Sequence, residues 1–544
     1  MVLRTLYQTL LDSDPARLRV IAQQWDIALQ ATRKTDMAAE LADAMASADT
    51  IAGLLDRLTP DQRAALDDLL RRGGTLPWAI FVRRWGEIRP AGPGRVEREA
   101  LWQAPVSPAE ALWFLGVVQR AFLEQDALSA EMAFVPGELR LYMPDPAPIV
   151  TPAPPQTATP PYVIPGTDAL ADDLVTLWIG LQRSDDAHSE PPVVSAQPRI
   201  ALLETLCIEQ SWLRRDAGAL RPVPSAIVAW LRDTPWRQWA SLAQAWVTSA
   251  AWNDLAYVPT LAPDPVQAWP NDPVSTRQGL IGCLRLCELA KWYDIQAFIS
   301  YVHTHSPDFL RPTGDYQSWA PRDVQSGVPL RGFEAWTAVE GALIAYILSG
   351  PLAWLGLVDL GSLSPEVAPA AFRLTQAGAA LLLGAPPPEL PEPPPLQAGA
   401  HGEFVAPPRR RYERFQLSRI ADSVPRDKGY AYRLSPSSLD RAKQQRIPYA
   451  RIVTFLEEAS GGAPLPAPIR GAIQRAYQGE ARASLEHLWV LRVQDPQHLK
   501  IPTVQALVDQ VIGPNMAIVR GDRRERLLQV LADHGILADI VERD

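Results

Sequence analysis

The chain has 544 residues, 47% of them hydrophobic, and a formal net charge of −9 at pH 7. Such a length provides for roughly three or four domains, and the apolar content excludes a globally disordered chain. Three cysteines argue against a disulfide framework, and the N-terminus lacks the charged and apolar regions of a secretory signal. The most apolar stretch, "GALIAYILSGPLAWLGLVDLG", is interrupted by Gly350 and Pro351. We therefore expect a cytoplasmic protein that does not cross a membrane.

The N-terminal region, residues 1–143, has the pattern of a winged-helix domain. Thr59 and Pro60 predict a helix start within "TIAGLLDRLTPDQRAALDDLLRRGG", and the two glycines predict its end. A second helix is predicted over "TLPWAIFVRRWG". A third is predicted over "SPAEALWFLGVVQRAFLEQ", where Ser107, Pro108 and Glu110 match a capping box. The alternating stretch "MAFVPGELRLYMP" predicts two short strands. Three helices followed by a β-ribbon are typical of winged-helix domains.

Two proline-rich stretches divide the chain. Residues 144–165 contain nine prolines, and Pro386–Pro395 contains seven prolines within the stretch 386–400. Runs of proline lack backbone donors and favour extended spacers, so we predict two exposed linkers.

The middle of the chain is expected to hold a helical region rich in tryptophan, residues 166–331. Trp236, Trp239 and Trp246 recur at helical spacing, which indicates a core face more than a base-stacking platform. Cys283 and Cys287 are interpreted as small core side chains, and His303 and His305 as part of a surface loop. From residue 332 to 385 the order of a winged helix recurs, which predicts a second such region.

The C-terminal region, residues 401–544, begins with a predicted strand, "GEFVA", and a basic helix, "PRRRYERFQLSRIADSV". A strand from Tyr430 to Leu434 then turns at once into a helix with Ser435 as N-cap and Pro436 at its first position. Two more helices are predicted over "YARIVTFLEEAS" and "LPAPIRGAIQRAYQGE". Strands follow around an Asp-Pro turn, and a helix that stops at Gly535 and a last strand end the region.

These C-terminal motifs resemble the N-terminal domain of XPB-type DNA helicases, which recurs in bacterial helicase-associated proteins. The matching residues are Tyr432, Leu434, Ser435, Ser438, Leu439, Ala442, Phe455, Leu456 and Pro466. Gln445 and Arg446 stand where the family has a glycine after the first helix. The resemblance covers about residues 400–544 and implies association with a helicase. The fold expected overall is mainly α with small β elements, formed by winged-helix modules and this C-terminal α/β domain.

Charge is distributed unevenly along the chain. Residues 401–544 carry a net charge of +5 and the remainder −14, which favours an anionic partner for the C-terminal region. Winged helices bind duplex DNA with a helix in the major groove and a wing over the backbone, where arginines contact phosphates. A solvated surface is the alternative for each arginine. The candidate phosphate contacts are Arg83, Arg84, Arg89, Arg95, Arg98, Arg409, Arg410, Arg411 and Arg414.

The sequence contains no recognisable motor. None of its five lysines follows a glycine, so the phosphate-binding loop GxxxxGK[ST] is absent. The motif "DDAH" at Asp185–His188 resembles a DEAH box only superficially, since no buried strand precedes it. We find no zinc spacing, nucleophile motif or dinucleotide fingerprint, and expect no cofactor. The prediction is a non-catalytic DNA-binding or helicase-associated protein acting in DNA repair or transcription, with DNA and a helicase as partners. The alternative is a protein-interaction scaffold that does not bind DNA directly.

Overall fold

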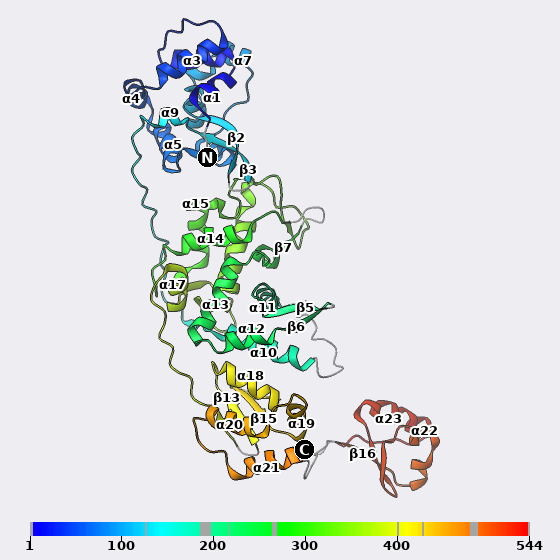
Figure 1. Cartoon of the computed structure of the whole chain (residues 1–544). Helices are drawn as coiled ribbons and strands as arrows, with labels where there is room; N and C mark the ends of the chain where they lie inside the picture. The colour runs from blue at the N-terminus through cyan, green and yellow to red at the C-terminus, as the bar shows by residue number, and fades with distance from the viewer. Residues whose placement is uncertain are drawn as a thin grey trace. The chain divides into compact units, whose positions relative to one another are not determined.

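The computed structural model describes residues 4–125, 128–184, 197–216, 218–263, 269–399, 402–426, 429–478 and 488–541. It is mainly helical, and its strands form small antiparallel sheets (Figure 1), which confirms the predicted fold class. The chain divides into two compact units. The first contains Met1–Pro395 and Ala406–Gln416, and the second contains Leu396–Val405 and Leu417–Asp544.

The first unit begins with five helices, and side-chain caps fix the starts of four of them, α1, α2, α4 and α5. Thr5, Asp14, Ser47 and Thr59 each accept a hydrogen bond from the backbone N–H three residues later, which satisfies a donor that the helix leaves free. The elements of this part are α1 (Leu6–Asp12), α2 (Pro15–Gln24), α3 (Lys34–Met45), α4 (Ala48–Arg57), α5 (Pro60–Arg71), β1 (Thr75–Pro77), α6 (Trp78–Trp85), α7 (Pro93–Glu99), α8 (Pro108–Phe114), β2 (Gln119–Gln125), β3 (Leu128–Phe134) and α9 (Gly137–Arg140).

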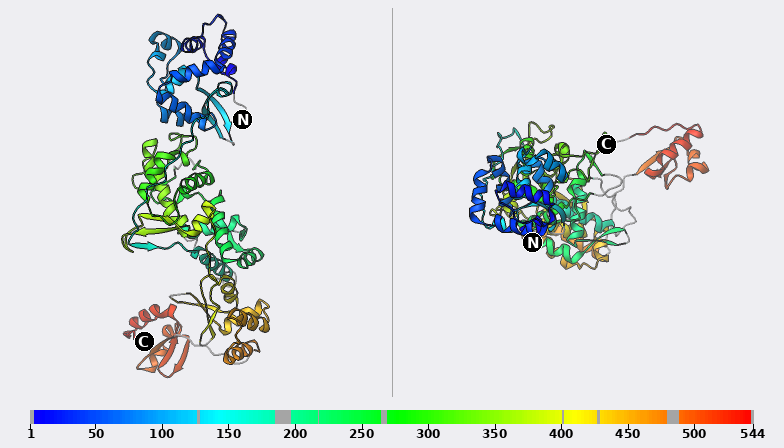
Figure 2. Two further views of the ribbon diagram at one scale, coloured as in Figure 1. Left: turned by 90° about the vertical axis from the view of Figure 1, so that its left-hand side faces the viewer. Right: turned by 90° about the horizontal axis from the view of Figure 1, so that it is seen from above.

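Elements α5 to β3 form a winged-helix module. Strand β1 follows the first helix, α6 and α8 come next, and the hairpin β2–β3 comes last. Antiparallel pairing of β3 with both β1 and β2 gives the order β1-β3-β2. Figure 2 shows the cyan hairpin β2–β3 beside the blue helices. Leu66, Phe81 and Leu112 come from the three helices and are buried in one core.

The third helix of this module is shorter than predicted. It ends at Phe114, and Gln119–Gln125, which the sequence assigns to the helix, forms β2 instead. Gly116 has φ +69°, and a Cβ there would lie 2.8 Å from Ile21 Cδ1, so the chain turns sharply against α2 at this point. Similarly, Gly137–Arg140 is a short helix where a strand was predicted.

The proline-rich stretch 144–165 is packed against the rest of the first unit, unlike the spacer that the sequence predicts. Tyr301 Oη donates to the carbonyl of Pro152 (2.7 Å), and Thr157 N donates to the carbonyl of Trp292 (2.8 Å). Strand β4 (Tyr162–Ile164) then pairs with β10 (Val358–Ser362). The stretch is therefore a strap with its own backbone partners.

The middle region and the predicted second winged helix share one core. Its buried residues run from Leu170 to Leu382 and include Phe415. Trp239 and Trp246 are buried on α13 and Trp236 is partly exposed, so the aromatic stripe is core, as predicted. The further elements are α10 (Ala169–Ser184), α11 (Pro198–Glu209), β5 (Leu213–Asp216), β6 (Ala219–Pro222), α12 (Pro224–Leu231), α13 (Pro235–Thr248), β7 (Leu261–Ala262) and β9 (Arg322–Asp323).

A second winged-helix arrangement lies in this core and begins well before residue 332. Its elements are α14 (Pro273–Leu284), β8 (Tyr293–Asp294), α15 (Ile295–His305), α16 (Ala342–Ile347), β10 and β11 (Ala371–Leu374), followed by α17 (Gln376–Leu383). The strand order β8-β11-β10 repeats that of the first module, and β4 adds a fourth strand. The sequence therefore identified only the third helix of this module and one strand of its wing, β11. Within "PLAWLGLVDLG", Val358–Gly361 belongs to β10, where a helix was expected.

Cys283 and Cys287 are part of the same core, whereas His303 is partly buried at its edge and His305 is exposed. Cys283 and Cys287 are buried, as predicted, and burial raises the pKa of Cys287 to about 12. His303 and His305 lie in the last turn of α15, and not in a loop, and His303 contacts the rings of Phe333 and Trp336. Among the described residues, no three His, Cys, Asp or Glu side chains gather as metal ligands would.

One described helix, Phe333–Leu352, is long and apolar enough to cross a membrane by length and composition. It contains α16 and the π-helical turns on either side, and 61% of its most apolar window is buried inside the structure, as in the core helix of a globular unit. Gly350 has non-helical dihedral angles, which places an interruption where the Gly-Pro pair predicts one.

The second unit contains two small sheets. The first has the order β12-β13-β15-β14 and four helices, and the second has the order β16-β18-β17 with α22 and α23 around Val519 and Leu531 (Figure 1). Helix α18 (Arg411–Ile420) is divided between the units, since its residues up to Gln416 belong to the first. The other elements are β12 (Gln397–Ala398), β13 (Glu403–Ala406), β14 (Asp422–Val424), β15 (Tyr430–Arg433), α19 (Pro436–Gln444), α20 (Tyr449–Ala459), α21 (Ala467–Gln478), β16 (Trp489–Arg492), α22 (Pro502–Gln505), β17 (Gln510–Gly513), β18 (Met516–Val519) and α23 (Arg524–Asp533).

The strand-to-helix switch at Ser435 is formed as predicted. The Ser435 hydroxyl accepts from Ser438 N (3.0 Å), and the Ser438 hydroxyl accepts from Ser435 N (3.0 Å). Ser438 Oγ also donates to the carbonyl of Ile420 (2.9 Å), which ties the cap to the end of α18. Residues 536–541, where a last strand was predicted, form neither helix nor strand.

We predict that Arg311→Met destabilises the first unit. Arg311 Nε donates to Glu340 Oε1 (2.7 Å), and both side chains are almost fully buried. Burial raises the pKa of Glu340 to about 7. Without Arg311, ionised Glu340 has no counterion, and the free energy of unfolding should fall by about 3–5 kcal/mol. Because a raised carboxyl pKa means that stability is lost as the carboxyl ionises, the loss should be larger at pH 8 than at pH 5.5.

Urea unfolding followed by tryptophan fluorescence measures this effect. The exposed Arg331→Met variant is the matched control and should change stability by no more than about 0.5 kcal/mol. The double variant Arg311→Met/Glu340→Met should recover most of the loss. Equal stability of the single and double variants would show that the buried charge is not what destabilises the protein.

Candidate functional site

Three of the four predicted C-terminal arginines lie at a buried acidic pair at the start of α10, where Asp168 directly precedes the helix and Asp172 is in its first turn. Arg411 Nη2 donates to Asp168 Oδ2 (2.8 Å) and Arg411 Nε to Asp172 Oδ1 (3.1 Å), while its Nη1 donates to Gln238 Oε1 (2.9 Å). The Arg411 side chain is 0% exposed. Arg409 Nε donates to Asp168 Oδ2 (2.8 Å). We call Arg409, Arg411, Asp168, Asp172 and Gln238 the arginine clasp.

Arg414 extends these contacts along α10. Its Nη1 donates to the carbonyl of Asp172 (2.8 Å), and its Nη2 donates to Thr176 Oγ1. Of the four predicted C-terminal arginines, only Arg411 and Arg414 are within α18, since the helix begins at Arg411 and Arg409 has φ +71°. The prediction that Arg409, Arg410 and Arg411 share one helix is therefore wrong, and the turn at Arg409 aims its side chain at the same carboxylates.

The two carboxylates of the arginine clasp have opposite pKa shifts. Burial raises the pKa of Asp172 above its usual range despite the nearby Arg411. Burial also opposes ionisation of Asp168, but hydrogen bonds and charge from Arg409 and Arg411 outweigh it and lower the pKa of that carboxyl. Such divergence is found in acid–base pairs of enzymes. Here both side chains are 7% exposed and neither lines the adjacent cavity, so the pair is suited to holding the chain and not to meeting a substrate.

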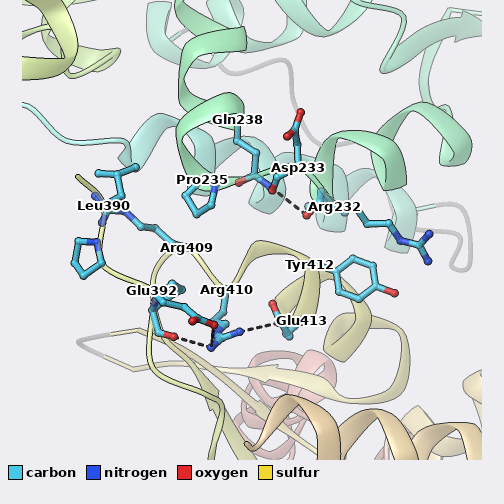
Figure 3. Close-up of a pocket in the computed structure, with 13 residues that line it drawn as sticks. Arg232, Asp233, Pro235, Gln238, Leu390, Glu392, Arg409, Arg410, Tyr412 and Glu413 are labelled. Carbon is cyan, nitrogen blue, oxygen red and sulfur yellow. Dashed lines mark hydrogen bonds and ion pairs between the residues drawn. The ribbon is translucent and has the colours of Figure 1, made fainter. Parts of the chain in front are cut away.

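A cavity of about 460 Å³ lies beside the arginine clasp (Figure 3). Figure 3 shows Arg410 between Glu392 and Glu413, to which its Nη atoms are joined at 3.5 and 3.2 Å. Arg410 also donates to the carbonyls of Pro393 and Pro394, so the second proline-rich stretch is held by this side chain. The charged lining consists of Arg232, Asp233, Glu392, Arg409, Arg410 and Glu413. Three cations against three carboxylates give no excess charge that would select an anion.

Three of the N-terminal arginines are paired with carboxylates and partly buried. Arg83 Nη2 donates to both oxygens of Asp308 (2.7 Å), Arg84 contacts Asp68 (3.2 Å), and Arg89 forms a forked pair with the buried Glu110. Glu110 is the residue that the sequence placed in a capping box. The Ser107 hydroxyl accepts a hydrogen bond from Glu110 N, as in a capping box. The Glu110 carboxylate, however, accepts from Arg89 and not from Ser107 N, so the reciprocal half of the box is missing.

Arg95 and Arg98 are both exposed. Both lie on α7, where Arg95 Nε contacts Glu99 (3.0 Å). Arg98 has no ion pair in the described part of the chain. The structure thus brings Arg409, Arg411 and Arg414 together around acids, but it does not assemble the nine arginines into one basic surface. Whether any of them contacts DNA stays a prediction.

The third helix of each winged-helix module is the element that would enter a major groove. In the first module, α8 has five buried residues out of seven, and the Arg17 guanidinium of α2 lies 3.6 Å from the Trp113 ring on it. In the second, α16 and its flanking turns expose only Thr337, Ala338 and Ser349. Neither helix contains a lysine or arginine.

The wings add no positive charge. The third helix and wing of the first module, residues 108–134, contain one basic and four acidic residues, and residues 333–374 of the second module contain the same numbers. The one arginine of each segment is paired with an acid of the same segment: Arg120 forms an ion pair with Glu131, and Arg373 Nε lies 2.7 Å from Asp359 Oδ2. The order of elements of a winged helix is therefore present without the positive charge on which duplex binding depends.

Sequence reasoning missed Asp168, Asp172 and Gln238. The two aspartates are four residues apart, which places them on one helical face, but such pairs are common on solvated helices. Nothing local indicated that a chain segment more than two hundred residues later would cover them. The motif Asp185–His188 lies outside the described residues. No family model and no curated protein matches this chain.

We predict that Arg411→Ala destabilises the first unit far more than Arg410→Ala. Removing Arg411 leaves the buried Asp172 without a counterion and leaves Asp168 with Arg409 alone, which should lower the free energy of unfolding by about 3–5 kcal/mol. Arg410 is partly exposed and should contribute about 1 kcal/mol or less. Because the two residues are adjacent, each serves as the control for the other in chemical denaturation. Equal losses would contradict the assignment of Arg411 to a buried clasp.

Proposed function

We propose that this chain is a non-catalytic scaffold whose winged-helix modules bind protein and do not read duplex DNA. The observation that carries the proposal is the net charge of −3 on the third helix and wing of each module. DNA binding depends on cations that neutralise phosphates, and an acidic wing placed over a phosphate backbone is repelled. Burial of α8 and α16 supports the same conclusion, because a helix covered by its own domain has no free face for a groove.

Exposed apolar side chains on the wings support a protein partner. Phe122 is 71% exposed on β2, and Leu363 is 75% exposed on the wing of the second module. Large apolar side chains anchor protein interfaces, where they fill pockets on the partner and exclude water. Each wing therefore offers at least one such anchor among its described side chains.

The resemblance of residues 401–544 to the XPB-type N-terminal domain supports a helicase as the class of partner. The chain has no phosphate-binding loop of its own, so a motor would be supplied by another chain. A scaffold of this kind would act in DNA repair or transcription without hydrolysing ATP.

A photo-crosslinking experiment in the source cell tests this proposal. A photoreactive amino acid at Leu363 should form crosslinks to a protein, and nuclease treatment should not remove them. The same amino acid at Ser326, an exposed loop residue of the same unit, is the matched control and should give no such crosslink. Crosslinks from Leu363 to DNA would refute the proposal. So would salt-sensitive duplex binding that is lost on Arg120→Ala/Arg373→Ala.

A further inference from the structure

The turn between α19 and α20, residues 443–451, gathers exposed cations with no acidic residue among them. Its sequence is "KQQRIPYAR", and Lys443, Arg446 and Arg451 are all exposed. None of the three has an ion pair within the described part of the chain. The acids Glu457 and Glu458 lie at the other end of α20, and Glu457 is held by Arg470 and by Leu465 N. Asp440, one turn before Lys443, is partly buried on α19.

Two tyrosines hold the turn in place. Tyr477, near the end of α21, donates its hydroxyl hydrogen bond to the carbonyl of Ile447 (2.8 Å). Its ring centroid lies 6.2 Å from that of Tyr449 and 5.5 Å from Lys443 Nζ. Burial raises the pKa of Tyr477, which keeps its phenol neutral. The cations are therefore presented by a packed framework and not by a free loop.

Arg446 has an unfavourable backbone conformation for its residue type. It follows the last residues of α19 with φ +58°. Arg446 N donates to the carbonyl of Lys443 (2.9 Å) and Ile447 N to that of Ala442 (3.0 Å), which together form a Schellman motif. Glycine is favoured at this left-handed position, because a Cβ there is sterically strained. An arginine keeps the strain and adds a guanidinium at the tip of the turn.

The surroundings favour a polyanion over a protein. In the described residues of 402–478, no large hydrophobic side chain is exposed. A protein interface needs an apolar centre, and a membrane surface site needs apolar residues that enter the lipid. A phosphate backbone needs only cations at suitable positions, and arginine suits it through its forked donors.

We propose that the 443–451 turn binds the phosphate backbone of a nucleic acid through Lys443, Arg446 and Arg451. Backbone contacts carry no base information, so binding is independent of sequence. This nucleic-acid surface lies in the second unit and is separate from the wings, so it can fail or succeed independently of the proposed protein contacts.

Fluorescence anisotropy with labelled single-stranded and duplex oligonucleotides, over a range of salt concentrations, tests the proposal on the full chain. The variant Lys443→Ala/Arg446→Gly/Arg451→Ala should lower affinity by about tenfold or more, and the slope of log affinity against log salt by about two or three units. The control Arg57→Ala/Arg237→Ala/Arg331→Ala removes the same charge from exposed positions of the first unit and should leave both unchanged.

The single variant Arg446→Gly separates binding from folding. Glycine relieves the left-handed strain, so the melting temperature should stay the same or rise while affinity falls and the salt slope decreases by about one unit. A structural role for Arg446 would instead leave binding intact. Three results would each overturn the proposal. The triple variant and its control could lose the same affinity, the wild-type chain could fail to bind nucleic acid, or it could bind polyglutamate as tightly as it binds nucleic acid.

Discussion

Buried arginine–carboxylate pairs hold together segments of the first unit that are distant in sequence. Arg277 contacts Asp254, Arg311 contacts Glu340, and Arg411 contacts Asp168 and Asp172, with all three arginine side chains at most 2% exposed. A buried pair adds little net stability compared with an apolar pair, but losing one partner leaves an uncompensated charge. Each pair therefore disfavours any packing in which its partner is missing. Of the three arginines, Arg411 joins the segments that are farthest apart in sequence, since it connects residues 406–416 to a helix that begins at Ala169.

Buried arginine–carboxylate pairs also affect how the winged-helix modules can be used for binding. Both have the strand order and helix order of the fold, yet their third helices are core elements and their wings are acidic and apolar. In the second module the third helix carries Glu340, whose partner Arg311 fixes it inside the unit. A helix committed to such a pair is not free to enter a groove. The fold alone would have suggested DNA reading, and the charge and burial of these side chains are the reason for proposing a protein-binding role instead.

Features that depend on neighbouring residues could be predicted from the sequence. The Thr59 and Ser435 caps, the mainly helical composition and the buried tryptophan stripe follow from local spacing. The start of the second module could not be predicted, because β8 has two residues and is defined only by pairing with β11. The roles of the arginines were equally hidden, since a guanidinium on a solvated helix and one facing a distant aspartate have the same sequence pattern. Arg446 was noticed only as a missing glycine, and its importance depends on a φ angle that sequence does not show.

The strap that carries β4 also bears on self-association. Without it, the outer edge of β10 would present unpaired backbone donors and acceptors, which are a template for pairing with another chain. Strand β4 occupies that edge, and Pro160, Pro161 and Pro165 flank its three residues. Proline cannot donate a hydrogen bond to an incoming strand, so the new edge is short and blocked at both ends. The proline-rich composition that resembles a spacer thus serves as protection against edge-to-edge aggregation of the sheet.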